Sequence, residues 1–219
     1  MTNQSIDGNK EYWNQFYKSF QRRTPSQFCV SVITDLQPGA SVVELGSGNG
    51  RDSFFFAEQG FATVAMDASE IAIATCNEYA QARGITDSHF LHGDITKEND
   101  VAKAVSGARA NSTSGSVTIY SRFVMHSLDD GQQAAFLQAL GACSIADDKI
   151  YFEFRSQGDA SLEKHYGGHY RRYVDTTHFI SELANVAGFD ANYSITGQGM
   201  ARFQEEDPVV SRIIATKRP

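Results

Sequence analysis

Three glycines within five residues, directly after a short apolar run, constrain the fold of this chain more than any other feature. The run is Ser41–Leu45, and the glycines follow in the sequence VELGSGNGRD at residues 43–52. A buried strand that leads through a glycine turn into a helix brings backbone N–H groups and a helix N-terminus toward a ligand. Glycine is needed because a side chain would block that approach and because tight turns can require a positive φ. The segment therefore predicts a strand, a ligand-binding turn and a helix.

Further apolar runs alternate with helical periodicity along the chain. Ser69 and Asp175 are the expected N-caps of two helices, and Gly84 is an expected C-terminal stop. Strands that are apolar on both faces and separated by helices predict an α/β fold with a doubly wound, mostly parallel sheet. We expect strands at residues 62–66, 89–91, 117–120, 150–154 and 213–216, and helices at residues 52–59, 69–84, 132–140 and 179–187.

The composition limits the class of protein. A chain of 219 residues with 41% hydrophobic and 21% charged residues fits a single globular domain. No apolar run approaches the roughly 18 residues of a membrane helix, and the start of the chain lacks the profile of a secretory signal. The formal charge of −7 argues against nucleic acid as a partner.

The three cysteines are widely spaced, so we expect neither a disulfide framework nor a metal site, and a cytoplasmic protein. His165 and His169 have a spacing that could bind one metal ion on a helix, but the two glycines between them argue against a helix there.

An acidic residue ends the second predicted strand, about twenty residues after the glycines. This residue, Asp67 in the sequence MDAS, can accept two hydrogen bonds from a ribose diol in a doubly wound fold. The ligand is therefore expected to carry a nucleoside, as NAD and S-adenosylmethionine both do. The dinucleotide fingerprint GxGxxG has a third glycine where this chain has Arg51, and Glu44 would repel a pyrophosphate but attract a sulfonium or an ammonium.

The motifs VELGSGNGRD, MDAS, HGDI and YSRFVMHSL, in this order, resemble the class I S-adenosylmethionine-dependent methyltransferases. The resemblance implies a seven-stranded sheet, S-adenosylmethionine as the cofactor and a catalytic α/β core over residues 38–219. In such a site Asp67 holds the ribose, Asp94 and Ile95 hold the adenine, and either Arg51 or Asp52 contacts the amino-acid end. The residues that the resemblance places around the cofactor are Glu44, Gly46, Ser47, Gly48, Arg51, Asp52, Asp67, Ala68, Ser69, Asp94, Ile95, Ser121, Arg122 and Phe123.

A narrower set of motifs is similar to small methyltransferases associated with glycosyltransferases in bacterial surface-polysaccharide pathways. These motifs are EYWNQFY, PSQF, GNGRDSFFFA, SRFVMHSL and HYRRYVD. The similarity implies that N-terminal cap helices over residues 1–37 fold over the cofactor as a lid, and it implies an association with glycosyltransferase machinery. Trp13 and Phe28 would then cover the cofactor, although aromatic residues on an amphipathic helix also serve as core.

The sequence HYGGHYRRY at residues 165–173 gathers imidazoles, phenols and guanidiniums in an otherwise acidic chain. Arginine binds phosphate or carboxylate through its planar fork, so we expect this segment to bind the acceptor. A small anionic saccharide or phosphosaccharide is the preferred acceptor class. Alternatives are surface ion pairs of Arg171 and Arg172 with Glu163 or Asp175. The expected substrate-binding residues are Arg155, His165, Tyr166, His169, Tyr170, Arg171 and Arg172.

His126 is the candidate general base, since it lies just past the fourth predicted strand and titrates in the useful range. A hydroxyl acceptor benefits from such a base, whereas an anionic acceptor needs only to be positioned. Shaping of the cofactor pocket is the alternative role of His126. The acceptor itself stays open, because a thiol, an amine or an inorganic oxyanion would suit the same donor. A protein that binds the cofactor without turnover is the alternative from another functional class.

Overall fold

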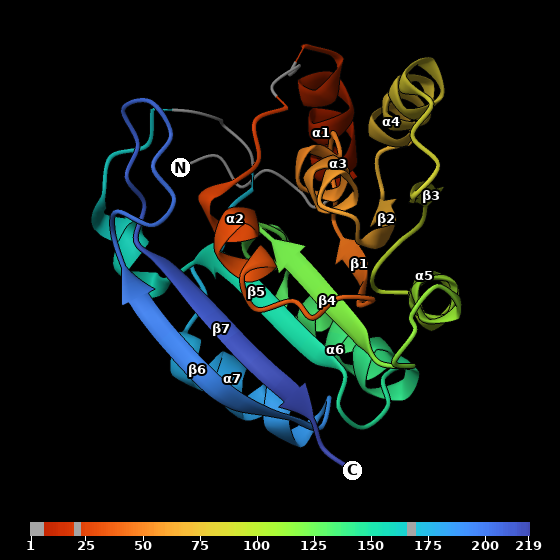
Figure 1. Ribbon diagram of the computed structural model, residues 1–219. Helices are drawn as coiled ribbons and strands as arrows, with labels where there is room; N and C mark the ends of the chain where they lie inside the picture. The colour runs from red at the N-terminus through yellow and green to blue at the C-terminus, as the bar shows by residue number, and fades with distance from the viewer. Residues whose placement is uncertain (1–6, 20–22, 166–169) are drawn as a thin grey trace.

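The computed structural model describes residues 7–19, 23–165 and 170–219, and its centre is a seven-stranded sheet (Figure 1). The strand order is β3-β2-β1-β4-β5-β7-β6. The strands are β1 (Ser41–Leu45), β2 (Ala62–Asp67), β3 (Ser88–His92), β4 (Val117–Arg122), β5 (Lys149–Arg155), β6 (Phe189–Gly197) and β7 (Val210–Lys217).

The sheet is mixed, which corrects the expectation of a mostly parallel one. Strands β3, β2, β1, β4 and β5 pair in parallel, but β7 runs antiparallel to both of its neighbours, β5 and β6. No helix lies between β6 and β7, and a strand that returns without a crossover helix pairs antiparallel. Sequence analysis missed β6 because its residues are almost all exposed, so it lacks the apolar run that marks a buried strand.

Helices cover both faces of the sheet (Figure 1). On one face Val43, Leu45 and Ile119 share a buried cluster with residues of α5, α6 and α7. On the other face Val42 and Tyr120 pack with residues of α2 and α3. The helices are α1 (Asp7–Ser19), α2 (Gln27–Ile33), α3 (Arg51–Glu58), α4 (Glu70–Arg83), α5 (Glu98–Ala110), α6 (Asp130–Cys143) and α7 (Thr176–Asn185), with short 3₁₀ turns η1 (Met125–Ser127) and η2 (Gln157–Ser161).

The expected helix caps are present. The Ser69 hydroxyl accepts a hydrogen bond from the Ala72 amide at 3.2 Å, and Gly84 ends α4 with a φ of 65°. Asp175 caps α7, which starts at Thr176, about one turn before the predicted helix. Helix α5 was not predicted, and its polar first turn hides the amphipathic pattern.

The carboxyl ends of β1, β2 and β4 meet at one edge of the sheet because these three strands are parallel neighbours. Each strand leads there into a segment that carries predicted site residues: the glycine loop at residues 46–50, residues 67–69, and residues 122–126. Within the described ranges, no helix has the length and apolar character that crossing a membrane would require.

Packing of α7 on the sheet depends on Phe179. Its ring centroid lies 5.1 Å from that of Phe152 and 4.9 Å from that of Phe154, and the residue is fully buried. We expect Phe179→Ala to lower the free energy of unfolding by about 3–5 kcal/mol, because it leaves a cavity between α7 and β5. Urea denaturation measures this loss. Val186→Ala, at the exposed end of α7, should change the same quantity by less than about 0.5 kcal/mol. A loss below about 1 kcal/mol for Phe179→Ala would contradict this role.

Candidate active site

The glycine loop after β1 requires its glycines. Gly46, Gly48 and Gly50 have φ angles of 86°, 53° and 72°, which L-residues with side chains rarely adopt. A Cβ atom at Gly46 would overlap the side chain of Val124, and one at Gly48 would overlap the hydroxyl of Tyr17. Backbone and neighbouring side chains thus approach each other closely over the loop.

Asp67 joins the end of β2 to this loop. Its Oδ2 accepts a hydrogen bond from the Gly48 amide at 2.8 Å, and its Oδ1 accepts one from the Ser69 amide at 2.8 Å. Burial raises the pKa of the Asp67 carboxyl, an effect that these two amides oppose. Each carboxylate oxygen keeps a further lone pair, so Asp67 can still accept hydrogen bonds from a ribose diol.

Asp94 follows β3 and presents a carboxylate oxygen. Its Oδ1 accepts hydrogen bonds from the amide and the hydroxyl of Thr96 at 2.9 and 2.8 Å. Within the described residues its Oδ2 takes part in no hydrogen bond, so that atom can accept one from an amino group. Ile95 is 8% exposed and packs in the core beneath.

The hydroxyl of Ser47 lies buried in the glycine loop without a hydrogen-bond partner among the described residues. A buried hydroxyl that stays unpaired costs free energy, so most are satisfied by protein, water or ligand. This orphan hydroxyl and the Asp67 carboxylate, side by side at the glycine loop, fit a nucleoside-bearing cofactor.

Helix α1 covers the glycine loop. Tyr17 lies over Gly48, and Asn14 accepts a hydrogen bond from the Ser69 hydroxyl at 2.5 Å. The Trp13 ring stacks on Tyr17 with 5.9 Å between centroids. Burial and the nearby Asp67 raise the pKa of Tyr17 well above its usual range. Sequence analysis missed Asn14 and Tyr17, although the spacing of four residues between Trp13 and Tyr17 put both aromatic residues on one helix face.

Asp52 holds structural elements together through its carboxylate. Its carboxylate accepts hydrogen bonds from the Ser26 amide and hydroxyl, each at 2.7 Å, and from the Tyr120 hydroxyl at 2.8 Å. These bonds fasten the N-terminus of α2 to α3 and β4. Of the two residues expected at the amino-acid end of the cofactor, Arg51 is therefore the one with donors to spare. Its Nε lies 3.9 Å from Asp52 Oδ1, and it makes no hydrogen bond within the described residues.

Glu44 is a second buried carboxyl in this region, and it accepts a hydrogen bond from the Ser53 hydroxyl. Burial, and then the negative charge of Asp52, raise the pKa of Glu44 well above its ordinary value. The protein therefore favours the protonated form of this side chain.

The end of β4 is rigidly held. The Ser121 hydroxyl donates a hydrogen bond to the Leu45 carbonyl at 2.9 Å, so it joins β4 to β1. Phe123 has a φ of 59°, and its amide donates to the Glu153 carbonyl at 2.7 Å. A bulky residue with positive φ is rare and concentrates at functional sites.

His126 has its imidazole buried behind Phe123, with 5.2 Å between the ring centroids. The Arg155 amide donates a hydrogen bond to Nδ1 of His126 at 3.4 Å. A neutral imidazole whose Nδ1 accepts carries its proton on Nε2, and it has no second lone pair with which to take a proton. This arrangement does not favour the general-base role that the sequence suggested.

Two of the arginines predicted to bind substrate are engaged inside the protein. Arg155 forms ion pairs with Asp159, at 2.8 Å, and with Glu206. Arg172 pairs with Asp130, not with the surface acids considered from the sequence, and its amide donates to the His126 carbonyl at 2.7 Å. Both guanidiniums therefore bind carboxylates of other segments of the protein.

The remainder of the basic segment is only partly placed. Burial raises the pKa of Tyr12 on α1, and the positive charge of Arg171 opposes this effect. The His165 amide donates to Glu206, and Tyr170 is half-buried. Tyr166 and His169 lie outside the described residues.

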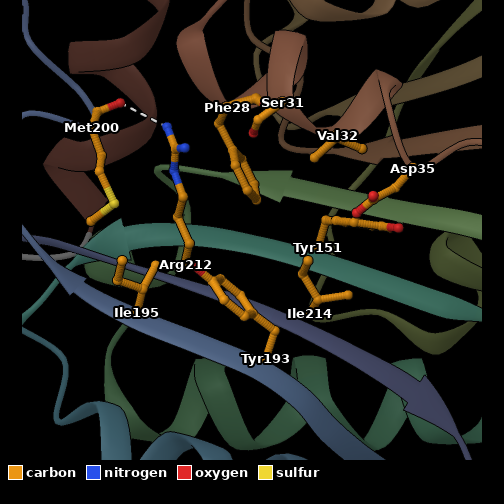
Figure 2. A pocket seen from close by; sticks show the side chains of 10 residues that line it. All are labelled: Phe28, Ser31, Val32, Asp35, Tyr151, Tyr193, Ile195, Met200, Arg212 and Ile214. Carbon is orange, nitrogen blue, oxygen red and sulfur yellow. Dashed lines mark hydrogen bonds between the residues drawn. The ribbon is translucent and has the colours of Figure 1, made fainter.

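Phe28 belongs to the core beneath α2. It is 2% exposed and stacks on Tyr120 with 5.2 Å between centroids. Its other side lines a cavity of about 180 Å³ between α2 and strands β5, β6 and β7, opposite Tyr193 and Arg212 (Figure 2). The structure thus gives Phe28 the core role, and Trp13, on α1, is the predicted aromatic residue that lies by the glycine loop.

Comparisons with known proteins agree with this geometry. Residues 36–110 match the model of a family described as a methyltransferase domain, and no curated protein matches the chain. A solved S-adenosylmethionine-dependent methyltransferase from Anabaena variabilis is 18% identical, with 99% of this chain and 96% of that chain covered and a TM-score of 0.70. The glycopeptide N-methyltransferase MtfA, solved with S-adenosyl-L-homocysteine, is 13% identical over 89% of this chain and 88% of its own, with a TM-score of 0.64.

The [4+2]-cyclase SpnF is also similar, with 10% identity, 87% of this chain and 80% of that chain covered, and a TM-score of 0.64. At such identities the likeness concerns the fold. The chain has the Rossmann-like α/β fold of S-adenosylmethionine-dependent methyltransferases, and the comparisons support S-adenosylmethionine as the cofactor.

The raised pKa of Glu44 has a consequence for stability. Between the unfolded pKa of a glutamate, about 4.3, and its higher folded value, the native state holds a proton that the unfolded chain has lost. Stability therefore falls as pH rises through this window. We expect the stability of Glu44→Gln relative to the unmodified protein to be higher at pH 8 than at pH 4.

Urea denaturation at the two pH values measures this difference. Glu58→Gln, an exposed glutamate of the neighbouring helix α3, is the matched control and should leave the pH dependence unchanged. An equal effect of Glu44→Gln at both pH values would contradict the assignment.

Proposed function

We propose that this chain is a methyltransferase that uses S-adenosylmethionine to methylate a small anionic acceptor, such as an acidic saccharide or a phosphosaccharide. The observation that carries the proposal is the contact between the Gly48 amide and the Asp67 carboxylate, beside the unpaired Ser47 hydroxyl. A carboxylate that can accept from a ribose and an unpaired hydroxyl thereby lie together at the adjacent ends of β1 and β2.

Each part of the cofactor has residues suited to hold it. Asp67 would accept the ribose hydroxyls, and the unused oxygen of Asp94 would accept the adenine amino group. The glycine loop and Arg51 would hold the methionine part, whose carboxylate needs a cationic partner. Bound S-adenosylmethionine supplies an electrophilic methyl group. Helix α1 would act as the lid through Tyr17 and Trp13.

For the acceptor, the task of the protein is positioning. Holding the two reactants at near-attack distance can lower a barrier by roughly 7–11 kcal/mol. An anionic oxygen is already nucleophilic, so the reaction does not depend on a base. The proton arrangement of His126 suits such an acceptor. A saccharide as the acceptor and an association with glycosyltransferase machinery are supported only by the resemblance of the sequence motifs.

An assay for methyl transfer separates this proposal from its competitors. The full chain is incubated with methyl-labelled S-adenosylmethionine and a panel of nucleotide sugars, phosphosugars, sugar acids, thiols, amines and oxyanions. Label in the anionic sugars supports the proposal, and label in an amine or a thiol moves the chain to another acceptor class. Cofactor binding without any transfer would favour a non-catalytic binding protein, or chemistry of another kind as in the similar cyclase.

Cofactor affinity tests the ribose assignment. We expect Asp67→Ala to weaken the binding of S-adenosylmethionine at least tenfold, because a charge-assisted hydrogen bond contributes about 1.5–3 kcal/mol. Isothermal titration calorimetry gives the dissociation constant. Asp87→Ala, an exposed aspartate just before β3, is the control and should bind as the unmodified protein does. Unchanged affinity in Asp67→Ala would refute the assignment.

The role of His126 is tested by His126→Asn, whose amide oxygen can still accept the Arg155 N–H. We expect kcat to fall less than about tenfold and the pH profile to keep its shape, whereas the loss of a general base typically costs about 10²–10⁴-fold. The measurement is the pH dependence of kcat with the acceptor found in the panel. A fall of about 10³-fold that is smaller at high pH would restore His126 as the base.

A further inference from the structure

Three charged residues form a row across neighbouring strands at the edge of the sheet that carries the site. Arg122 on β4 pairs in register with Glu153 on β5, which pairs in turn with Arg212 on β7. The Glu153 carboxylate is fully buried and accepts one hydrogen bond on each oxygen, from Arg122 Nε and from Arg212 Nε, both at 2.7 Å. One carboxylate thus lies between two guanidiniums, and the negative charge of Asp52 also acts on Arg122.

The two guanidiniums differ in what else they bind. Arg212 donates a further hydrogen bond to the Met200 carbonyl at 2.7 Å (Figure 2) and lies over the Phe28 ring. The terminal nitrogens of Arg122 donate no hydrogen bond to any described residue. Its side chain is 14% exposed, so its terminal guanidinium nitrogens reach the surface at the end of β4. Arg122 is therefore oriented at Nε and available at its terminal nitrogens.

Phe123 supports the guanidinium of Arg122. The centre of that guanidinium lies 4.1 Å from the Phe123 ring centroid, a cation–π contact. The positive φ of Phe123 and its amide bond to the Glu153 carbonyl hold the ring in place. A residue fixed by its own packing and by a charged partner is what a precise binding group requires.

The guanidinium nitrogens that bind no described residue indicate what Arg122 binds. Burial lowers the pKa of Arg51, and the positive charge of the nearby Arg122 lowers it further. Neither guanidinium has a complete set of partners, yet the proposed cofactor carries only one carboxylate. Arg51 directly follows the glycine loop, so it is the natural partner of that carboxylate. Arg122 is then left for a second anion.

The location of Arg122 fits the acceptor. Gly46 and Arg122 each lie two residues beyond the paired residues Glu44 and Tyr120 on adjacent parallel strands. Such strands are about 4.8 Å apart, so a small molecule bound at Arg122 would reach the neighbourhood of the glycine loop.

We propose that Arg122 binds the anionic group of the methyl acceptor, a carboxylate or a phosphate, and that Glu153 is the positioning residue that aims it. This inference rests on the proposed function. It assigns recognition of the anion to Arg122, which the resemblance placed around the cofactor, whereas the sequence placed that recognition at Arg155 and in residues 165–172.

The test measures binding to the full chain saturated with S-adenosyl-L-homocysteine, by calorimetry. The probes are D-glucuronate for the carboxylate, D-glucose 1-phosphate for the phosphate and D-glucose as the uncharged control. We expect one of the two anions to bind more tightly than glucose, and Arg122→Gln to weaken its binding at least tenfold. The affinity for S-adenosyl-L-homocysteine should change less than twofold, which also reports that the variant is folded.

Further variants separate positioning from folding. Arg122→Lys keeps the charge but loses the planar fork, so it should lose about threefold to tenfold in anion affinity. Glu153→Gln should weaken anion binding less than Arg122→Gln does and leave cofactor affinity unchanged. Arg202→Gln, an exposed arginine between β6 and β7, is the matched control and should bind both molecules as the unmodified protein does.

Three results would overturn the inference: anion binding that Arg122→Gln leaves intact, a loss in that variant of cofactor affinity alone, or no preference of the unmodified protein for either anion. Failure of the unmodified protein to bind S-adenosyl-L-homocysteine would instead contradict the proposed function itself.

Discussion

The site depends on the hydrogen bond from the Gly48 amide to the Asp67 carboxylate. It ties the loop after β1 to the end of β2. It therefore fixes the position of the Asp67 carboxylate relative to the loop beside which a nucleoside would bind. The bond can form only because Gly48 has a positive φ and no side chain, and because parallel pairing brings both strand ends to one edge. Helix α1 then packs over this junction through Tyr17 and Asn14.

Buried charges organise the rest of this edge. Asp52 gathers α2, α3 and β4 through Ser26 and Tyr120, and Glu153 gathers β4, β5 and β7 through two arginines. Each carboxylate is satisfied by several donors, which is the condition under which a buried charge is tolerated. Glu44 accepts a hydrogen bond from the Ser53 hydroxyl, and burial together with the negative charge of Asp52 raises its pKa.

Sequence reasoning succeeded where the signal was local. The order of strands and helices, the caps at Ser69 and Asp175 and the glycine turn all depend on residues near one another in the chain. The reasoning was weaker for β6, an exposed edge strand, and for its antiparallel neighbour β7. Periodicity reports burial and not the direction in which a strand pairs.

The roles of individual polar residues were harder to predict, because their partners come from distant segments. Asp52 bonds Ser26 and Tyr120, and Arg172 pairs with Asp130. By itself the sequence determined the α/β class, the position of the glycine loop and the acids that end two strands, since these follow from periodicity and backbone freedom. Only the tertiary structure decided which arginines keep unpaired guanidinium nitrogens at the site. Among the described residues, hydrogen bonds between distant segments engage Arg155 and Arg172 and leave Arg51 and Arg122 available.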